Sequence, residues 1–85
     1  MRPLETSKFQ KLRSKLKEEA ERDALRTAVL AILDEPSAGK KLKGGFRDLR
    51  SFRYASQGQS RRLIYKLDKD AIVLLSFGPR QAIYK

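Results

Sequence analysis

The stretch LRSFRYASQGQSRRLIYKLDKDAIVLLSF (residues 49–77) has the pattern of three β-strands joined by two tight turns. Residues 61–67 are rich in β-favouring side chains, and residues 71–77 form a continuous apolar run typical of a central strand. SQGQS (56–60) and DKD (68–70) between them are turn signals. Strands joined by such short turns are antiparallel neighbours, so this stretch predicts an antiparallel sheet.

The first predicted strand alternates in polarity. Its two faces carry Arg50, Phe52 and Tyr54 on one side and Leu49, Ser51 and Arg53 on the other. By the same rule the neighbours Arg61 and Arg62 point to opposite faces, so only one of them can belong to an open basic face.

The preceding residues predict helices. Ser7 and Gln10 have the spacing of a capping box, so a helix begins near Thr6 or Ser7, and Pro36 ends the helical region. One apolar stripe runs through Phe9, Leu12, Leu16 and Ala20, and a second through Leu25, Ala28, Val29 and Ile32. The stripes lie about 180° apart on a straight helix, so we expect a break within residues 17–23 and a helical hairpin.

Residues 1–6 can add a short edge strand, because proline suits an edge, and PSAGKKLKGGF (36–46) reads as a loop.

These elements predict an α+β fold in which an N-terminal helical hairpin packs on one face of a small, twisted antiparallel sheet of three to four strands. Eighty-five residues suffice for one modest core, so we expect a single domain spanning residues 1–85. The other face of the sheet is then free.

Positive charge is concentrated in the second half of the chain. Residues 1–39 hold 8 basic and 7 acidic side chains (net +1), whereas residues 40–85 hold 12 and 3 (net +9), which together make the net charge of +10. The free face must carry much of this charge, which favours a phosphate-rich partner over a role in solubility alone. No apolar run is long enough to span a membrane and no signal-peptide core is present, so we expect a soluble, cytoplasmic protein without a membrane partner.

Several kinds of catalytic site are excluded by composition. The chain has neither cysteine nor histidine, and its paired carboxylates fall at a helix end and in a turn, so we expect no metal ion and no other cofactor. RNA can still be cleaved by its own 2′-hydroxyl, given a proton acceptor, cations for the phosphorane and a proton donor for the leaving group. Arginine suits the charge, and a tyrosine whose pKa is lowered by cations suits the base. The candidates are Arg53, Arg61, Arg62, Arg80 and Tyr84; alternatively they are solvated strand residues and an aromatic cap.

The order of motifs from residue 41 onward resembles the RelE/ParE superfamily of type II toxins of bacteria and archaea, and RelE in particular. The motifs are Lys41-Leu42-Lys43-Gly44, the basic strand 49–53, Arg62-Leu63-Ile64-Tyr65, the apolar strand 71–77, Gly78-Pro79-Arg80 and Ile83-Tyr84. The resemblance implies a toxin that is neutralised by a cognate antitoxin. It assigns catalytic roles to Arg53, Arg62, Arg80 and Tyr84, and contacts with the RNA backbone to Lys41 and Lys43. We expect the other basic residues of this part of the chain to bind RNA as well, namely Lys40, Arg47, Arg50 and Arg61. Ser51 stands where RelE has a second basic residue.

The resemblance also implies an activity. RelE-like members cleave mRNA on the ribosome without metal, so a ribosome-dependent mRNA endoribonuclease is the leading hypothesis, with ribosome and mRNA as partners. A ParE-like inhibitor of DNA gyrase and a non-enzymatic RNA-binding module are the alternatives. The antitoxin is expected to be acidic or amphipathic and to cover Arg62 and Arg80.

Overall fold

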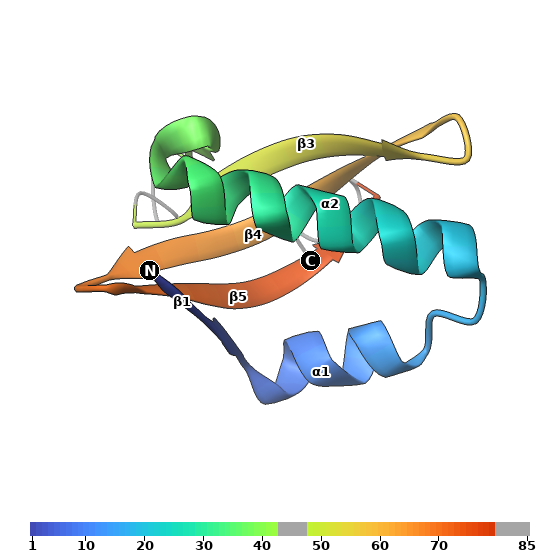
Figure 1. Cartoon of the computed structure of the whole chain (residues 1–85), viewed down its shortest axis with the longest axis horizontal. Coiled ribbons are helices and arrows are strands. Elements are labelled where there is room, and N and C mark those ends of the chain that lie inside the picture. Colours follow the sequence, from blue (N-terminus) through green and yellow to red (C-terminus); the bar gives the residue numbers. More distant parts are fainter. Residues whose placement is uncertain (43–47, 80–85) are drawn as a thin grey trace.

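A computed structural model describes residues 1–42 and 48–79 of the chain. The two α-helices of the described residues lie on one face of a sheet, as Figure 1 shows. The elements in chain order are β1 (Arg2–Glu5), α1 (Ser7–Ser14), α2 (Glu19–Asp34), the 3-10 turn η1 (Pro36–Ala38), β2 (Lys40–Lys41), β3 (Arg50–Ser56), β4 (Gln59–Asp68) and β5 (Ala71–Gly78). The α+β class and the helical hairpin are confirmed. Neither described helix combines the length and the apolar character needed to cross a bilayer.

The sheet is larger than predicted and mixed rather than purely antiparallel. Over residues 1–42 and 48–79 it has five strands in the order β1-β5-β4-β3-β2. The three strands predicted from residues 49–77 are antiparallel neighbours as expected, but β1 lies parallel to β5. A second departure is β2, which pairs with β3 inside the segment expected to be a loop. Lys40 and Lys41 have no strand pattern of their own, and pairing with β3 alone makes them a strand.

The two hairpin turns are as short as predicted. Gln57 and Gly58 both have positive φ, 53° and 78°, between the paired residues Ser56 and Gln59. Positive φ at both central positions gives the turn a twist that matches the strands. In the second turn Lys69 has φ 55°. These turns fix the register in which β3, β4 and β5 pair.

The first helix starts where predicted, but its cap is Thr6 rather than Ser7. The hydroxyl of Thr6 accepts a hydrogen bond from the amide of Phe9 at 3.1 Å and donates one to the carbonyl of Leu74 at 3.1 Å. The same side chain therefore caps α1 and ties it to β5. The predicted break is present at residues 15–18, which begins two residues earlier than expected, and α2 ends at Asp34.

The break lets both apolar stripes reach one core. Phe9 from α1 and Ile32 from α2 are buried against Leu63 and Ile72 of the sheet. Phe9 also meets Phe77 edge-to-face, with ring centroids 5.2 Å apart. All these contacts lie on the helix-covered face, so the opposite face of the sheet takes no part in this core.

Candidate functional site

The neighbours Arg61 and Arg62 on β4 have different surroundings. Arg61 pairs with Tyr54 of β3 on the helix-covered face. Its guanidinium donates to a carboxylate oxygen of Glu21 on α2 at 2.9 Å, and both side chains are about four-fifths buried. Arg61, predicted to bind RNA, therefore joins a helix to the sheet and lies on the other side from Arg62. The prediction that the two point to opposite faces is confirmed.

Arg62 lies on the open face, directly opposite Arg53. The two are Cα partners across β3 and β4, so their side chains leave the sheet side by side on the same face. Within residues 1–42 and 48–79, neither has a carboxylate at ion-pair distance. Like charges in this arrangement destabilise a sheet. Two adjacent arginines without a carboxylate partner in the described part of the chain make this pair the candidate site for an anion.

The residues around this pair are small. Arg62 donates a long hydrogen bond of 3.4 Å to the hydroxyl of Ser51, which is itself buried. On its other side Arg62 faces Gly78 of β5, which has no side chain to fill the space. Ser76 and Ile64, paired across β4 and β5, are buried further along the same face.

Lys40 of β2 adds a further positive charge to the open face. It pairs with Ser51, so its side chain leaves the sheet on the same face as Arg53 and Arg62. Lys66, four residues beyond Arg62 on β4, also shares this face by strand alternation, although the sequence reasoning did not select it. Its even spacing from Arg62 along the same strand could have identified it from the sequence.

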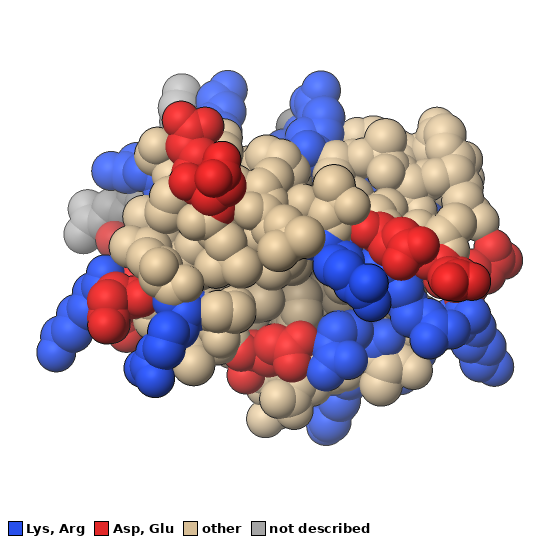
Figure 2. All heavy atoms as spheres, viewed as in Figure 1, with Lys and Arg blue, Asp and Glu red and all other residues tan. Residues whose placement is uncertain are grey.

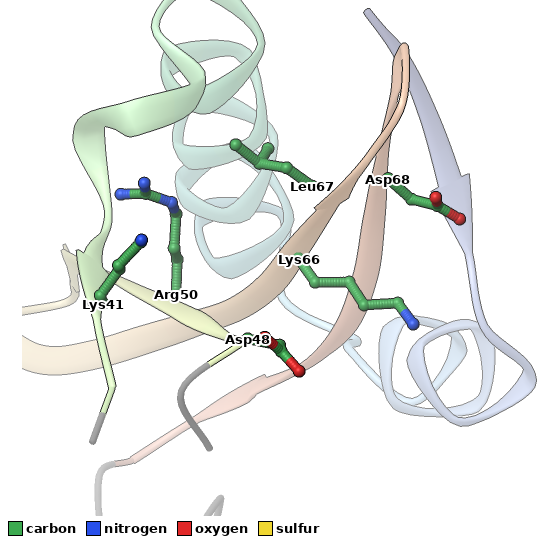
Figure 3. Close-up of a pocket in the computed structure, with 6 residues that line it drawn as sticks. All are labelled: Lys41, Asp48, Arg50, Lys66, Leu67 and Asp68. Atoms are coloured by element: carbon green, nitrogen blue, oxygen red, sulfur yellow. The ribbon is translucent and has the colours of Figure 1, made fainter. Parts of the chain in front are cut away.

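A second basic region lies at the far end of the sheet. A hollow of about 490 Å³ is lined by Lys41, Asp48, Arg50, Lys66, Leu67 and Asp68 (Figure 3). Arg50 is already engaged, because its guanidinium donates to the carbonyls of Gly39 at 2.8 Å and Ser37 at 3.4 Å. Lys41 pairs with Arg50 and shares its face. The predicted RNA contacts Lys41 and Arg50 therefore lie apart from the Arg53–Arg62 pair, next to two carboxylates.

Two tyrosines of the described chain have unsuitable environments for a base. Burial raises the pKa of Tyr54 to about 12, with Glu21 adding to the rise and Arg61 opposing it. Burial also raises the pKa of Tyr65. Both remain protonated at neutral pH. The predicted base Tyr84 lies outside the described residues, as do Arg80, Lys43 and Arg47.

The helix-covered side has a different charge pattern from the open face. In Figure 2 acidic and basic side chains are interspersed over it. Seven of the ten acidic residues belong to residues 1–39, which build the helices. The separation of charge along the sequence thus becomes a separation between the helix layer and the sheet.

Comparisons with known proteins agree with this architecture. The family model described as ParE-like toxin of type II bacterial toxin-antitoxin system matches residues 4–85. No curated protein matches. Among solved structures, isolated RelE toxin of E. coli is similar at 22% identity over 98% of this chain and 89% of that chain, with a TM-score of 0.73.

Two toxin–antitoxin complexes are similar as well. The intact RelBE complex of E. coli matches at 18% identity over 92% of this chain and 94% of that chain, with a TM-score of 0.73. The RelBE2 complex of Mycobacterium tuberculosis matches at 20% identity, covering 93% and 96%, with a TM-score of 0.68. The chain belongs to the ParE-like toxins of type II toxin–antitoxin systems, within the RelE/ParE superfamily.

Proposed function

We propose that this toxin is a ribosome-dependent mRNA endoribonuclease that uses the RNA's own 2′-hydroxyl as nucleophile and needs no metal ion or cofactor. The observation that carries the proposal is the pairing of Arg53 with Arg62 on the face of the sheet that the helices leave free. A stable protein gains nothing from two like charges held opposite each other. A phosphate between them turns this repulsion into binding.

The chemistry assigns each arginine a task. Attack of O2′ on phosphorus forms a phosphorane, and loss of O5′ leaves a cyclic phosphate and a free 5′-hydroxyl. Arg62, half-buried and held by Ser51, stabilises the charge that develops on the non-bridging oxygens. Arg53, more exposed, holds the substrate backbone in place.

The protons require two further groups. One accepts the proton of the 2′-hydroxyl, and the other gives a proton to O5′. Tyr84 and Arg80, which the resemblance assigns to this pocket, are proposed for these steps. Cations beside Tyr84 would lower its pKa toward the range of a working base.

We propose that the antitoxin inhibits the toxin by covering this site directly. A partner that places carboxylates on Arg62 and Arg80 competes with the phosphate for the same donors. A toxin–antitoxin complex in which both arginines stay accessible to RNA would contradict this mode of neutralisation.

The experiment is induced expression of the toxin followed by mapping of transcript 5′ ends. Wild-type toxin should arrest translation and produce new 5′-hydroxyl ends within coding regions. The double variant Arg53→Ala/Arg62→Ala should lose both effects, whereas Lys69→Ala, an exposed turn cation, should retain them. Purified toxin should cut mRNA bound to ribosomes and leave free mRNA intact. Unchanged cleavage by the double variant would refute the assigned site.

A second candidate is inhibition of DNA gyrase without nuclease activity. It is favoured by one observation, namely that the matching family model is described as ParE-like. It predicts intact transcripts, induction of the DNA-damage response and trapping of gyrase on DNA. The transcript-end experiment therefore separates the two candidates directly.

A further inference from the structure

The hollow at the far end of the sheet lies where β4 continues beyond β3. Arg50, the first residue of β3, pairs with Tyr65, and β4 runs on to Asp68. Residues 66–68 therefore have no β3 partner in the described part of the chain. Because Arg50 and Lys66 lie on opposite faces of the sheet, side chains of both faces border the hollow (Figure 3). Its volume of about 490 Å³ is typical of a site for a small organic ligand.

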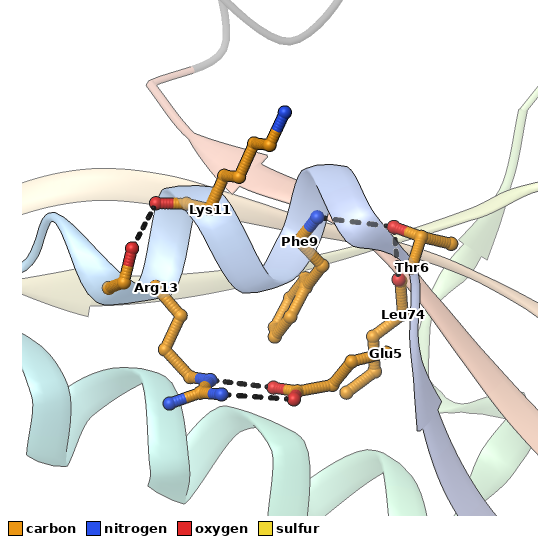
Figure 4. A network of polar contacts seen from close by, with 7 residues as sticks. Glu5, Thr6, Phe9, Lys11, Arg13 and Leu74 are labelled. Atoms are coloured by element: carbon orange, nitrogen blue, oxygen red, sulfur yellow. Dashed lines mark hydrogen bonds and ion pairs between the residues drawn. The ribbon is translucent and has the colours of Figure 1, made fainter.

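Opposite charges line this hollow without pairing. Three cations and two carboxylates take part, namely Lys41, Arg50, Lys66, Asp48 and Asp68. Among these side chains no cation is at ion-pair distance from a carboxylate. Arg13 and Glu5 on the helix-covered side, by contrast, are joined by two hydrogen bonds of 2.7 and 3.1 Å (Figure 4). Opposite charges that stand apart around one hollow suit a ligand that carries both an anion and hydrogen-bond donors.

The guanidinium of Arg50 is held at the wall of the hollow. Its Nη1 donates to the carbonyls of Gly39 at 2.8 Å and Ser37 at 3.4 Å. A planar guanidinium fixed in this way offers a stacking surface to an unstacked RNA base. Leu67, which is 37% exposed, adds an apolar contact to the lining.

Lys66 connects the hollow to the arginine pair on the open face. It lies four residues beyond Arg62 on the same strand and the same face. At about 3.3 Å per residue, the two positions are about 13 Å apart along β4. One RNA strand that crosses the open face can therefore place one phosphate on the Arg53–Arg62 pair and another on Lys66.

We propose that the hollow is a subsite for a neighbouring nucleotide of the bound mRNA and that it selects a base with an amino group. Lys66 binds the phosphate of this nucleotide, and Arg50 stacks on its base. The carboxylates of Asp48 and Asp68 accept hydrogen bonds from the edge of that base. The inference rests on the proposed nuclease function, because it assigns a further part of the same substrate.

The two carboxylates decide which base is accepted. An ionised carboxylate can only accept hydrogen bonds, so the base must present a donor to it. Cytosine, adenine and guanine each carry an amino group on the edge that an unstacked base exposes. Uracil has carbonyl oxygens on both sides of its ring N–H, and these oxygens are repelled by a carboxylate. The hollow therefore discriminates against uridine.

The binding test is an NMR titration of isotope-labelled toxin with the four nucleoside 5′-monophosphates. The toxin carries Arg53→Ala/Arg62→Ala, so that phosphate binding at the arginine pair does not contribute. Cytidine, adenosine and guanosine monophosphates should shift the backbone amide signals of residues 66–68. Uridine monophosphate should bind about five-fold more weakly.

Exposed charges in the neighbouring turn provide matched controls. Asp48→Asn/Asp68→Asn should remove the preference, because an amide can also donate to the carbonyls of uracil, whereas Asp70→Asn should keep it. Lys66→Ala should weaken all the nucleotides that bind, whereas Lys69→Ala should not. Equal binding of the four nucleotides, binding of none, or equal effects of the two lysine variants would overturn the proposal.

Mapped cleavage sites show whether the nucleotide belongs to the mRNA. In transcripts cut by toxin with an intact arginine pair, uridine should be depleted at one position beside the cut, and Asp48→Asn/Asp68→Asn should restore it. A base preference in the titration without this change would mean a site for a free nucleotide and would refute the mRNA subsite. The same preference in a toxin that cuts no mRNA would refute the nuclease function but confirm the nucleotide site.

Discussion

Arg61 and Arg62 are adjacent on β4, but their side chains lie on opposite faces of the sheet and have different surroundings. Arg61 is enclosed by a helix and matched by Glu21 at 2.9 Å, as expected of a charge that stabilises the fold. Arg62 faces a second arginine and a glycine, and within residues 1–42 and 48–79 its one side-chain hydrogen bond goes to the hydroxyl of Ser51. Among the residues that the structure describes, Arg61 has a carboxylate partner and Arg62 has none.

Tyr65 is a second polar side chain on the helix-covered face that has partners within the protein. The hydroxyl of Tyr65 donates to the carbonyl of Pro36 and accepts from the amide of Gly39, both at 2.8 Å, and its side chain is fully buried. It anchors the chain between α2 and β2. Arg61 and Tyr65 thus have polar partners within the protein on this face, so they should affect stability rather than activity.

The largest expected effect separates the two neighbouring arginines. Arg62→Ala should lower mRNA cleavage by roughly 10²–10³-fold, as the loss of one donor to a developing charge does in other enzymes. Its unfolding free energy should hardly change. Single-turnover cleavage on ribosomes and denaturant titration measure the two quantities.

Arg61→Ala should show the reverse. Losing the largely buried pair with Glu21 should cost about 1–2 kcal/mol of stability and leave cleavage by the folded protein unchanged. If Arg61→Ala lowered cleavage as strongly as Arg62→Ala, the distinction between the faces would fail.

The next effect concerns the anchor on the helix-covered face. A Cβ at Gly39 would collide with the hydroxyl of Tyr65 and approach its Cε1 to 2.7 Å. Gly39→Ala should therefore destabilise the protein by about 1–3 kcal/mol, measured by denaturant unfolding. Ser37→Ala, at an exposed site in the same turn, is the control and should be neutral. A neutral Gly39→Ala would mean that η1 is not held against Tyr65.

A smaller effect should appear on the open face with the opposite sign. Arg53→Thr removes the repulsion with Arg62 and should stabilise the protein by about 0.2–1 kcal/mol while lowering cleavage. Ala55→Thr on the same strand and face reports the gain from β-propensity alone. A loss of stability in Arg53→Thr beyond that control would show that the arginine pair supports the fold.

The smallest effect is a pH dependence on the helix-covered face. The folded state raises the pKa of Tyr54 from 10.0 to about 12, so folding favours its protonated form. This contribution is complete below pH 10 and is lost as pH rises from 10 toward 12. The melting temperature should fall less steeply in that window for Tyr54→Phe than for wild type. Parallel curves would show that the hydroxyl is not desolvated.

Much of the fold follows from local pattern. The alternation in residues 49–55, the apolar run 71–77 and the two turn signals identified β3, β4 and β5, and opposed apolar stripes identified the hairpin. The strand at residues 40 and 41 was not predicted, because two lysines have no β pattern. The parallel pairing of β1 with β5 was not predicted either, because it depends on the path of the chain through both helices.

The candidate site was predictable in part. Strand alternation separates Arg61 from Arg62 without any structure. The roles proposed for Arg80 and Tyr84 stay predictions. The engagement of Arg50 by the Gly39 carbonyl could not be foreseen, because it depends on where η1 returns to the sheet.

The amino-acid sequence by itself determined the class of this protein, since side-chain periodicity and the order of motifs are local properties of the chain. It also determined that positive charge would gather on the sheet, because residues 40–85 carry +9 and build most of it. Only the tertiary structure decided which arginine of β4 has a carboxylate partner in the described part of the chain, because placing Arg53 opposite Arg62 and Arg61 beside Glu21 depends on register and on where α2 lies. The placement of the helices has the same origin, since α1 packs mainly on β5 and α2 mainly on β3.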